Sequence, residues 1–161
     1  AQAGLLLTSA AVLWFSGSWI AANVPALSSK TLRVRLGAVC VLVGTGAGFL
    51  TLTDTAPVLV IAAVWSIGGL GMGLAASTLG VLLLDHSAPG AQGANSAAMQ
   101  TSDAVVQSLV LAVGSVVFAV MLSVDEMTGY VLVFVLAAGT AALAVAVTGR
   151  VSERQPTHTA T

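Results

Sequence analysis

Long uncharged stretches constrain this chain more than any other feature of its sequence. Of its 161 residues only 5 are Lys or Arg and 6 are Asp or Glu, and these charges divide the chain into long apolar runs. A soluble domain carries roughly 25% charged residues, whereas here 7% are charged and 57% are hydrophobic. So few charged side chains cannot cover a soluble domain, but they suffice where lipid tails form the surroundings. The composition therefore predicts an integral membrane protein.

Each apolar run is long enough for one membrane-spanning helix. Such a helix needs about 20 mainly apolar residues to cross roughly 30 Å of hydrocarbon. Strands of membrane barrels have about 10 residues and alternate polar with apolar positions, unlike the unbroken runs of Ala, Leu and Val here. We therefore expect an all-α, polytopic helix bundle over residues 1–149 and a polar tail over 150–161. The expected spans are about 4–26, 36–53, 57–84, 96–122 and 128–149.

The positions of the cations test this span count independently. Five spans place every Lys and Arg on one side of the membrane, in a basic loop after the first span and in the C-terminal tail. Positively charged loops stay in the cytoplasm, so we expect a cytoplasmic C-terminus in the cell membrane and an N-terminus outside. The five cations are Lys30, Arg33, Arg35, Arg150 and Arg154.

Small residues mark a packing face on the third expected span. Gly69 and Gly73 are four residues apart and therefore share one helix face. Small residues at this spacing let two helix backbones approach closely within lipid. A nucleotide-binding loop is a poor alternative, because the spacing is not GxGxxG and the context is an apolar helix. We predict that Gly69 and Gly73 pack against another helix.

Asp103 is the unusual charge, because it follows the expected start of the fourth span. A helix that starts near Gly93 or Asn95 places Asp103 two to three turns inside, on one face with Gln100 and Gln107. An ionisable group within a membrane is costly and generally faces a cavity or a partner. These three residues then line a substrate or proton pathway. In the alternative, the helix starts late and Asp103 lies at the lipid headgroups, next to the positive end of the helix dipole.

Other polar and aromatic residues carry weaker indications. Trp14 and Trp65 either line a pocket or contact lipid. His86, at the end of the third span, is more typical of a solvated loop residue than of a proton carrier. The single cysteine, Cys40, excludes an internal disulfide. With no catalytic triad, metal-ligand cluster or phosphate loop in the sequence, we expect no enzyme, cofactor, metal or nucleic-acid partner.

The order of these elements resembles the C-terminal half of a major facilitator superfamily transporter, nearest to drug:proton antiporter-like members. Residues 2–7 (QAGLLL), 17–21 (GSWIA) and the basic stretch 30–37 are similar to the eighth helix and the loop after it. The glycine-rich third span and the segment 93–114 resemble the tenth helix and the start of the eleventh. The resemblance implies a C-terminal fragment, about helices 8 to 12, of a six-helix bundle.

The resemblance also implies a function. It suggests a secondary active transporter that exports small organic or drug-like molecules against protons by alternating access. Its partners would be the lipid bilayer, the missing N-terminal half of the same transporter, the substrate and protons. The alternative from another class is a non-transporting membrane scaffold or assembly subunit.

Overall fold

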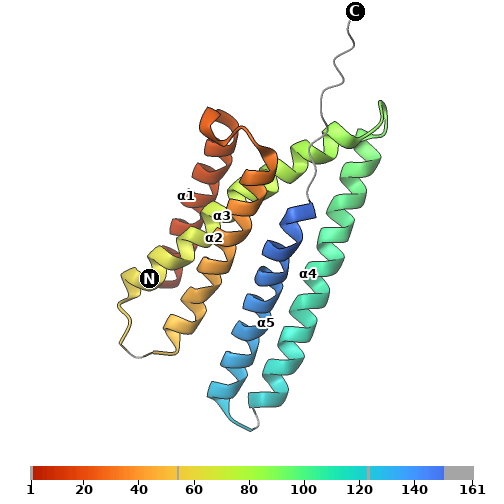
Figure 1. The fold of residues 1–161 in the computed structure, drawn as a ribbon. Helices are drawn as coiled ribbons and strands as arrows, with labels where there is room; N and C mark the ends of the chain where they lie inside the picture. Colours follow the sequence, from red (N-terminus) through yellow and green to blue (C-terminus); the bar gives the residue numbers. More distant parts are fainter. Residues whose placement is uncertain (1, 54, 123, 151–161) are drawn as a thin grey trace, which may run out of the picture.

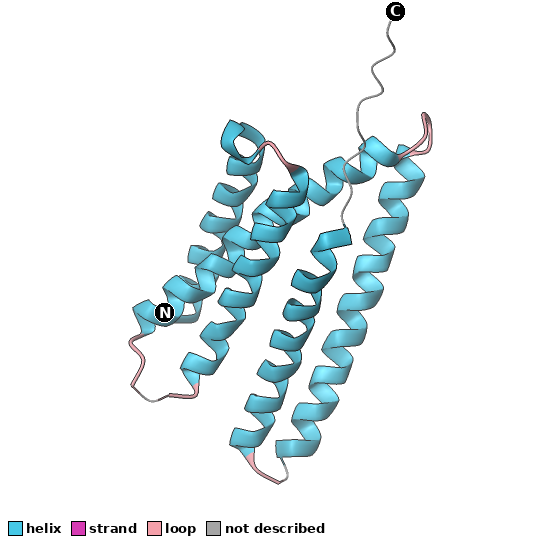
Figure 2. Cartoon of the chain, viewed as in Figure 1, coloured by secondary structure: helices cyan, strands magenta, loops and turns pink. Residues whose placement is uncertain are grey.

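The computed structural model is a bundle of long α-helices (Figures 1 and 2). It describes residues 2–53, 55–122 and 124–150, and these ranges contain no β-strand. The all-helical prediction is confirmed. The elements are α1 (Gln2–Asn23), η1 (Pro25–Leu27), α2 (Lys30–Thr51), α3 (Val58–His86), α4 (Gln92–Leu122), α5 (Glu126–Val147) and η2 (Thr148–Arg150).

Four of these helices combine the length and the apolar composition that a membrane span requires. Over the described residues, α2, α3, α4 and α5 extended by η2 are long and apolar enough to cross a membrane. The helix α1 has 22 residues but is not among the four. The membrane-protein character predicted from composition therefore agrees with the fold, while the fifth span stays a prediction.

Successive helices run in opposite directions (Figure 1). The α1–α2 connection, the α3–α4 turn and η2 lie at one end of the bundle, and the other two connections lie at the opposite end. Lys30, Arg33, Arg35 and Arg150 all belong to elements at the first end. These four cations thus gather at one end of the bundle, while the side of a membrane that they occupy stays a prediction, and Arg154 lies outside the described residues.

The basic loop was predicted too long, since α2 begins at Lys30 and not near residue 36. Lys30, Arg33 and Arg35 therefore occupy the first turns of a helix. The start is set by Ser29, whose side chain accepts a hydrogen bond from the backbone N–H of Leu32 at 3.2 Å. This N-cap satisfies one of the free N–H groups of the first turn. The prediction used charge as the boundary and overlooked the cap.

Cations at the start of a helix oppose the helix dipole, and two contacts offset this cost. Lys30 forms an ion pair with Asp85 near the end of α3. The Nε–H of Arg33 donates to the backbone carbonyl of Leu27. The first contact joins the ends of α2 and α3, and the second folds the short connection back onto α2.

Gly69 and Gly73 pack against another helix, as predicted. A Cβ added at Gly69 would overlap the carbonyl of Ala10, and one added at Gly73 would overlap the carbonyl of Trp14. The hydroxyl of Ser18 also donates to the carbonyl of Gly73 at 3.3 Å. The backbones of α1 and α3 are therefore in direct contact, which is the packing mode expected in lipid.

A second glycine contact joins α2 to the same central helix. A Cβ at Gly37 would come within 2.7 Å of the carbonyl oxygen of Gly71, and one at Gly44 within 2.5 Å of Cα of Gly68. Small residues on both sides of α3 thus hold α1 and α2 against it. Gly37 was not recognised from the sequence, because it stands alone next to the basic stretch.

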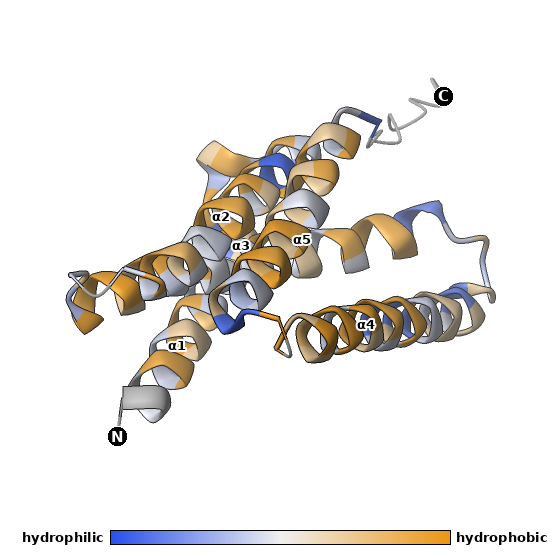
Figure 3. Ribbon diagram, turned by 90° about the horizontal axis from the view of Figure 1, so that it is seen from below, coloured by the Kyte–Doolittle hydropathy of each residue, from blue (hydrophilic) through white to orange (hydrophobic). Residues whose placement is uncertain are grey.

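The helix α4 is packed in a different way. None of its described residues is buried, and in α5 only Gly129 and Ala141 are. Figure 3 shows α4 apart from α1, α2 and α3, with α5 closest to it. The rings of Phe118 and Tyr130 link α4 to α5 at a centroid distance of 5.0 Å. The fold therefore consists of a tight group, α1 to α3, and a looser pair, α4 and α5.

Candidate functional site

A cleft between α3 and α4 brings together two of the residues predicted to line a pathway. It has a volume of about 610 Å³. The stretch of α3 from Met72 to His86 forms one wall, and Met99, Asp103 and Gln107 of α4 form the other. The cleft therefore begins near the middle of α3 and extends to its last residue, at the end of the bundle that carries the cations.

Asp103 lies well inside its helix. The helix α4 begins at Gln92, four residues before the predicted start, so Asp103 follows about three turns, or roughly 16 Å, of helix. The turn before it contains Gly90 at φ 85°, a conformation that favours glycine. The side-chain amide of Asn95 donates to the hydroxyl of Ser87 at 2.8 Å and fixes the first turn of α4 to the end of α3. The helix therefore does not start late, while the depth of Asp103 in a membrane stays a prediction.

Gln100 does not join Asp103 and Gln107 in the cleft. It lines a neighbouring hollow of α4 together with Thr101 and Ser108. The three side chains lie within about 60° of one another around the helix, yet only Asp103 and Gln107 line the cleft with α3. The predicted group of three is thus divided between two neighbouring hollows.

The polar groups of the cleft have no protein partners. Within the described ranges, neither the carboxylate of Asp103 nor the amide of Gln107 takes part in a hydrogen bond or ion pair. The α3 residues opposite them are Met, Ala and Leu. Both side chains are exposed in the described chain, so a carboxylate and an amide beside these apolar walls can bind water or a polar or cationic ligand.

His86 lies at the mouth of the cleft and is exposed, as the sequence favoured, but it belongs to α3 and not to a loop. It belongs to the last turn of α3, and its Nδ1 lies 2.8 Å from the carbonyl oxygen of Leu82. A carbonyl oxygen only accepts, so Nδ1–H is the donor in this contact. The cleft therefore combines an imidazole at its mouth with a carboxylate and an amide further inside.

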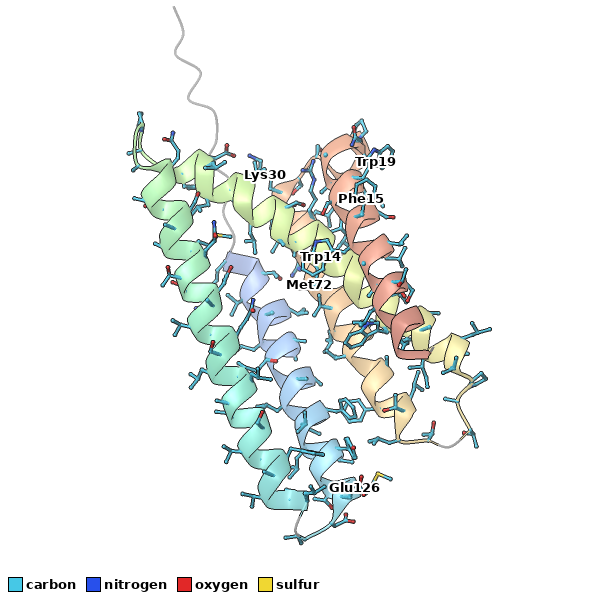
Figure 4. All side chains as sticks on the ribbon, turned by 180° about the vertical axis from the view of Figure 1, so that it is seen from behind. Trp14, Phe15, Trp19, Lys30, Met72 and Glu126 are labelled. Carbon is cyan, nitrogen blue, oxygen red and sulfur yellow. The ribbon has the colours of Figure 1, made fainter. Side chains whose placement is uncertain are left out.

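Trp14 and Trp65 meet in a separate pocket of about 230 Å³ between α1, α2 and α3. Both rings are partly exposed, at 46% and 44%. Met72 lines the same pocket, and Figure 4 shows Trp14 and Met72 near each other, with Phe15 and Trp19 on the outer part of α1. The two tryptophans thus line a pocket, and lipid contact by their exposed parts stays a prediction.

In the described ranges, no three His, Cys, Asp or Glu side chains come together in a group that could hold a metal ion. The fold and the cleft define an all-helical protein with helices of membrane-spanning length. Comparison with protein-family models, curated proteins and solved structures finds no match. The transporter family therefore rests on the resemblance of the sequence.

Proposed function

We propose that this chain is part of a secondary active transporter of the major facilitator type, which couples export of small organic or drug-like molecules to protons by alternating access. One observation supports the proposal most. Asp103 and Gln107 face a cleft between apolar helices with no hydrogen-bond partner in the described part of the chain.

The cost of such groups is the physical reason. An unpaired amide or carboxylate in apolar surroundings costs several kcal/mol by transfer estimates, of the order of 2–7 kcal/mol for the amide. Proteins keep such polar groups despite this cost where the groups bind a ligand or a proton or line a water-filled path. A membrane scaffold has no use for an unpaired carboxylate three turns inside a helix, so the cleft favours transport over that alternative.

The proposal includes a position in the membrane. All five long helices, α1 included, would span the cell membrane, with the cationic end of the bundle and the C-terminus in the cytoplasm. A cysteine replacing Pro89 in the α3–α4 turn should then be labelled only from the cytoplasm. A cysteine replacing Thr55 in the α2–α3 connection should be labelled only from outside. The reverse pattern, or labelling of both from one side, would contradict this topology.

A partner half is also part of the proposal. The helix α4 has no buried residue, although the group α1 to α3 has many. Outward residues such as Val116, 63% exposed, would contact lipid or further helices of the same transporter. The preceding half would close the cleft on its open side, so that rocking of the two halves exposes Asp103 to each side of the membrane in turn.

The test is Asp103→Asn in the full-length protein, with drug resistance of cells and proton-coupled uptake in vesicles as readouts. The substitution keeps the shape of the side chain and removes its titration. We expect coupled transport to be lost at normal expression. Glu126→Gln, at the opposite end of the bundle, is the matched control and should transport like the wild type. Wild-type transport by Asp103→Asn would remove the proposed role.

A further inference from the structure

Three cavities lie in succession along α3. The first, about 390 Å³, is lined by Ile61 and Trp65 among others. The second is the tryptophan pocket of about 230 Å³, which reaches from Trp65 to Met72. The third is the cleft of about 610 Å³, which continues from Met72 to His86. Together they follow α3 from its second turn to its last residue.

The α3 residues that line these cavities fall on one helix face. Eight of them recur in alternating steps of four and three residues, and this spacing marks a single stripe along a helix. The other three, Gly69, Ala76 and Leu83, each follow a residue of the stripe directly. The opposite side of α3 holds buried residues such as Ser66, Leu74 and Thr78. The stripe consists of Ile61, Trp65, Gly68, Met72, Ala75, Leu79, Leu82 and His86.

Two side chains of the stripe each belong to two cavities. Trp65 lines the first and the second, and Met72 lines the second and the third. Neighbouring cavities therefore meet at these residues. We propose that the three cavities form one continuous path along α3, and that Met72 is the movable constriction that sets the size of the molecules that pass. This inference rests on the proposed transport function.

Met72 is suited to a movable constriction by its chemistry and its neighbours. Its unbranched thioether side chain has three rotatable bonds and adapts to irregular gaps. Gly68 precedes it by one turn and Ala76 follows it by one turn, so no large side chain of α3 lies next to it on this face. Trp65 is a rigid ring by comparison. Size selection therefore falls to Met72.

The path would give its cargo two different surroundings. Between Trp65 and Met72 the lining contains no charged residue. Beyond Met72 the path reaches Gln107, then Asp103 and finally His86 at the mouth. A passing molecule would therefore leave polar contacts on one side of Met72 and meet aromatic and aliphatic contacts on the other. This arrangement suits molecules with one polar or charged group and a compact apolar body.

Thiol labelling separates a water-accessible path from a face that contacts lipid. In full-length protein carrying Cys40→Ala, single cysteines are placed at Met72 and Leu79 on the stripe. The controls are Ala63→Cys and Val81→Cys, both exposed and each about two and a half turns from Met72, hence on the opposite side of α3. A charged, membrane-impermeant reagent attacks only thiolates that water can reach.

We expect Met72→Cys and Leu79→Cys to react at least about tenfold faster than the two controls, because only a hydrated thiol ionises readily. Equal rates on both sides of α3, or unreactive stripe positions, would overturn the path. This readout needs no substrate. A labelled stripe without measurable export would therefore count against the transport proposal alone, and export with an unreactive stripe would count against the path alone.

The size of passing molecules tests the constriction itself. Met72→Ala should admit larger members of a graded series of organic cations, and Met72→Trp should restrict export to the smallest. Val81→Trp adds the same ring on the opposite side and should leave the size limit unchanged. An unchanged limit in both Met72 variants, at normal expression, would show that the narrow point lies elsewhere.

Discussion

The group α1 to α3 and the pair α4 and α5 use similar residues in different ways. In the first, glycines place backbones in contact, and the carbonyls of Ala10 and Trp14 lie where a Cβ of α3 would be. In the second, Gly114 of α4 has no neighbour within 4 Å, and aromatic rings make the contact between the helices. Glycine alone therefore does not identify a packed face, because its significance depends on whether another helix lies against it.

This difference also assigns stability to the group α1 to α3 and the proposed transport function to the boundary between α3 and α4. The tight group holds the tryptophan pocket, whose walls are fixed by backbone contacts. The cleft lies where tight packing ends, between the last turns of α3 and the loosely held α4. Two helices with few mutual contacts can change their separation at little cost, which is what alternating access requires. We expect substitutions in the two regions to differ accordingly.

The largest effect should come from Gly73→Leu. The new side chain would meet backbone atoms of Trp14 and Ser18, so the helices must separate. We expect a loss of about 3 kcal/mol or more, as for severe overpacking, seen as a strong fall in folded yield in membranes. Gly114→Leu is the matched control in the loose pair and should keep a normal yield. Equal losses for both would mean that α4 is as tightly packed as α1.

A smaller effect is expected for Phe134→Ala, which removes the bridge between the two regions. Phe134 of α5 covers Gly48 and stacks at an angle on Phe49 of α2, with ring centroids 5.8 Å apart. We expect a loss of about 2 kcal/mol, below the 3–5 kcal/mol of a fully buried ring, measured as a lower Tm in detergent. Val135→Ala, at the exposed neighbouring residue, should lower Tm far less. Equal decreases in Tm for the two variants would mean that Phe134 does not join the two regions.

The ion pair of Lys30 and Asp85 should contribute less again. Its side chains are 31% and 42% exposed, so water and salt screen the attraction. A double-mutant cycle with Lys30→Ala and Asp85→Ala should give a coupling free energy of at most about 1 kcal/mol. The coupling should shrink further at high salt. A larger coupling that salt does not change would mean that the ends of α2 and α3 are sealed from water.

The smallest effect concerns the helix caps and depends on pH. Hydrogen bonds from the hydroxyl and the backbone N–H of Thr128 hold the pKa of Asp125 below its usual value. A lowered folded-state pKa means that the cap stabilises α5 above the unfolded-state pKa and is lost as pH falls through the folded-state pKa. Amide protection at Thr128 should therefore decrease below about pH 4.

The cap of α2 provides the comparison within the same molecule. Ser29 has no titrating group, so protection of the Leu32 amide should not follow this pH dependence. Asp125→Asn should remove the pH dependence of protection at Thr128, because the amide oxygen still accepts the hydrogen bond but does not titrate. A parallel loss of protection at Leu32 would indicate general unfolding at low pH and not the loss of one cap.

Much of the fold follows from the sequence, because the lengths of the apolar runs and the positions of the charges can be read directly along the chain. The helices, the packing of Gly69 and Gly73, and the gathering of cations at one end were all predictable for this reason. The boundaries of the helices were harder to predict. The starts of α2 and α4 depend on Ser29 and on the bond between Asn95 and Ser87, which are local hydrogen bonds in polar stretches that resemble loops.

The cleft was predictable only in part. The spacing along α4 predicted that Gln100 shares a face with Asp103 and Gln107. Which of these residues line the cleft depends on the angle at which α3 and α4 diverge after their connecting turn, and the sequence does not contain that angle. The same is true of Met72 and His86, which the sequence presents as an apolar residue and a loop residue. Their significance comes from positions opposite α4. No pattern within a single helix contains that information.

The length of α3 has a consequence for the lipid around the protein. Its 29 residues rise about 43 Å, whereas the hydrocarbon layer is roughly 30 Å thick. A helix longer than the layer tilts, bends or thickens the bilayer locally, and Figure 1 shows α3 running obliquely past α1 and α2. Membrane thickness therefore acts on the inclination of the helix that carries both the cleft and the tryptophan pocket. Lipids with shorter or longer acyl chains should alter the geometry of both.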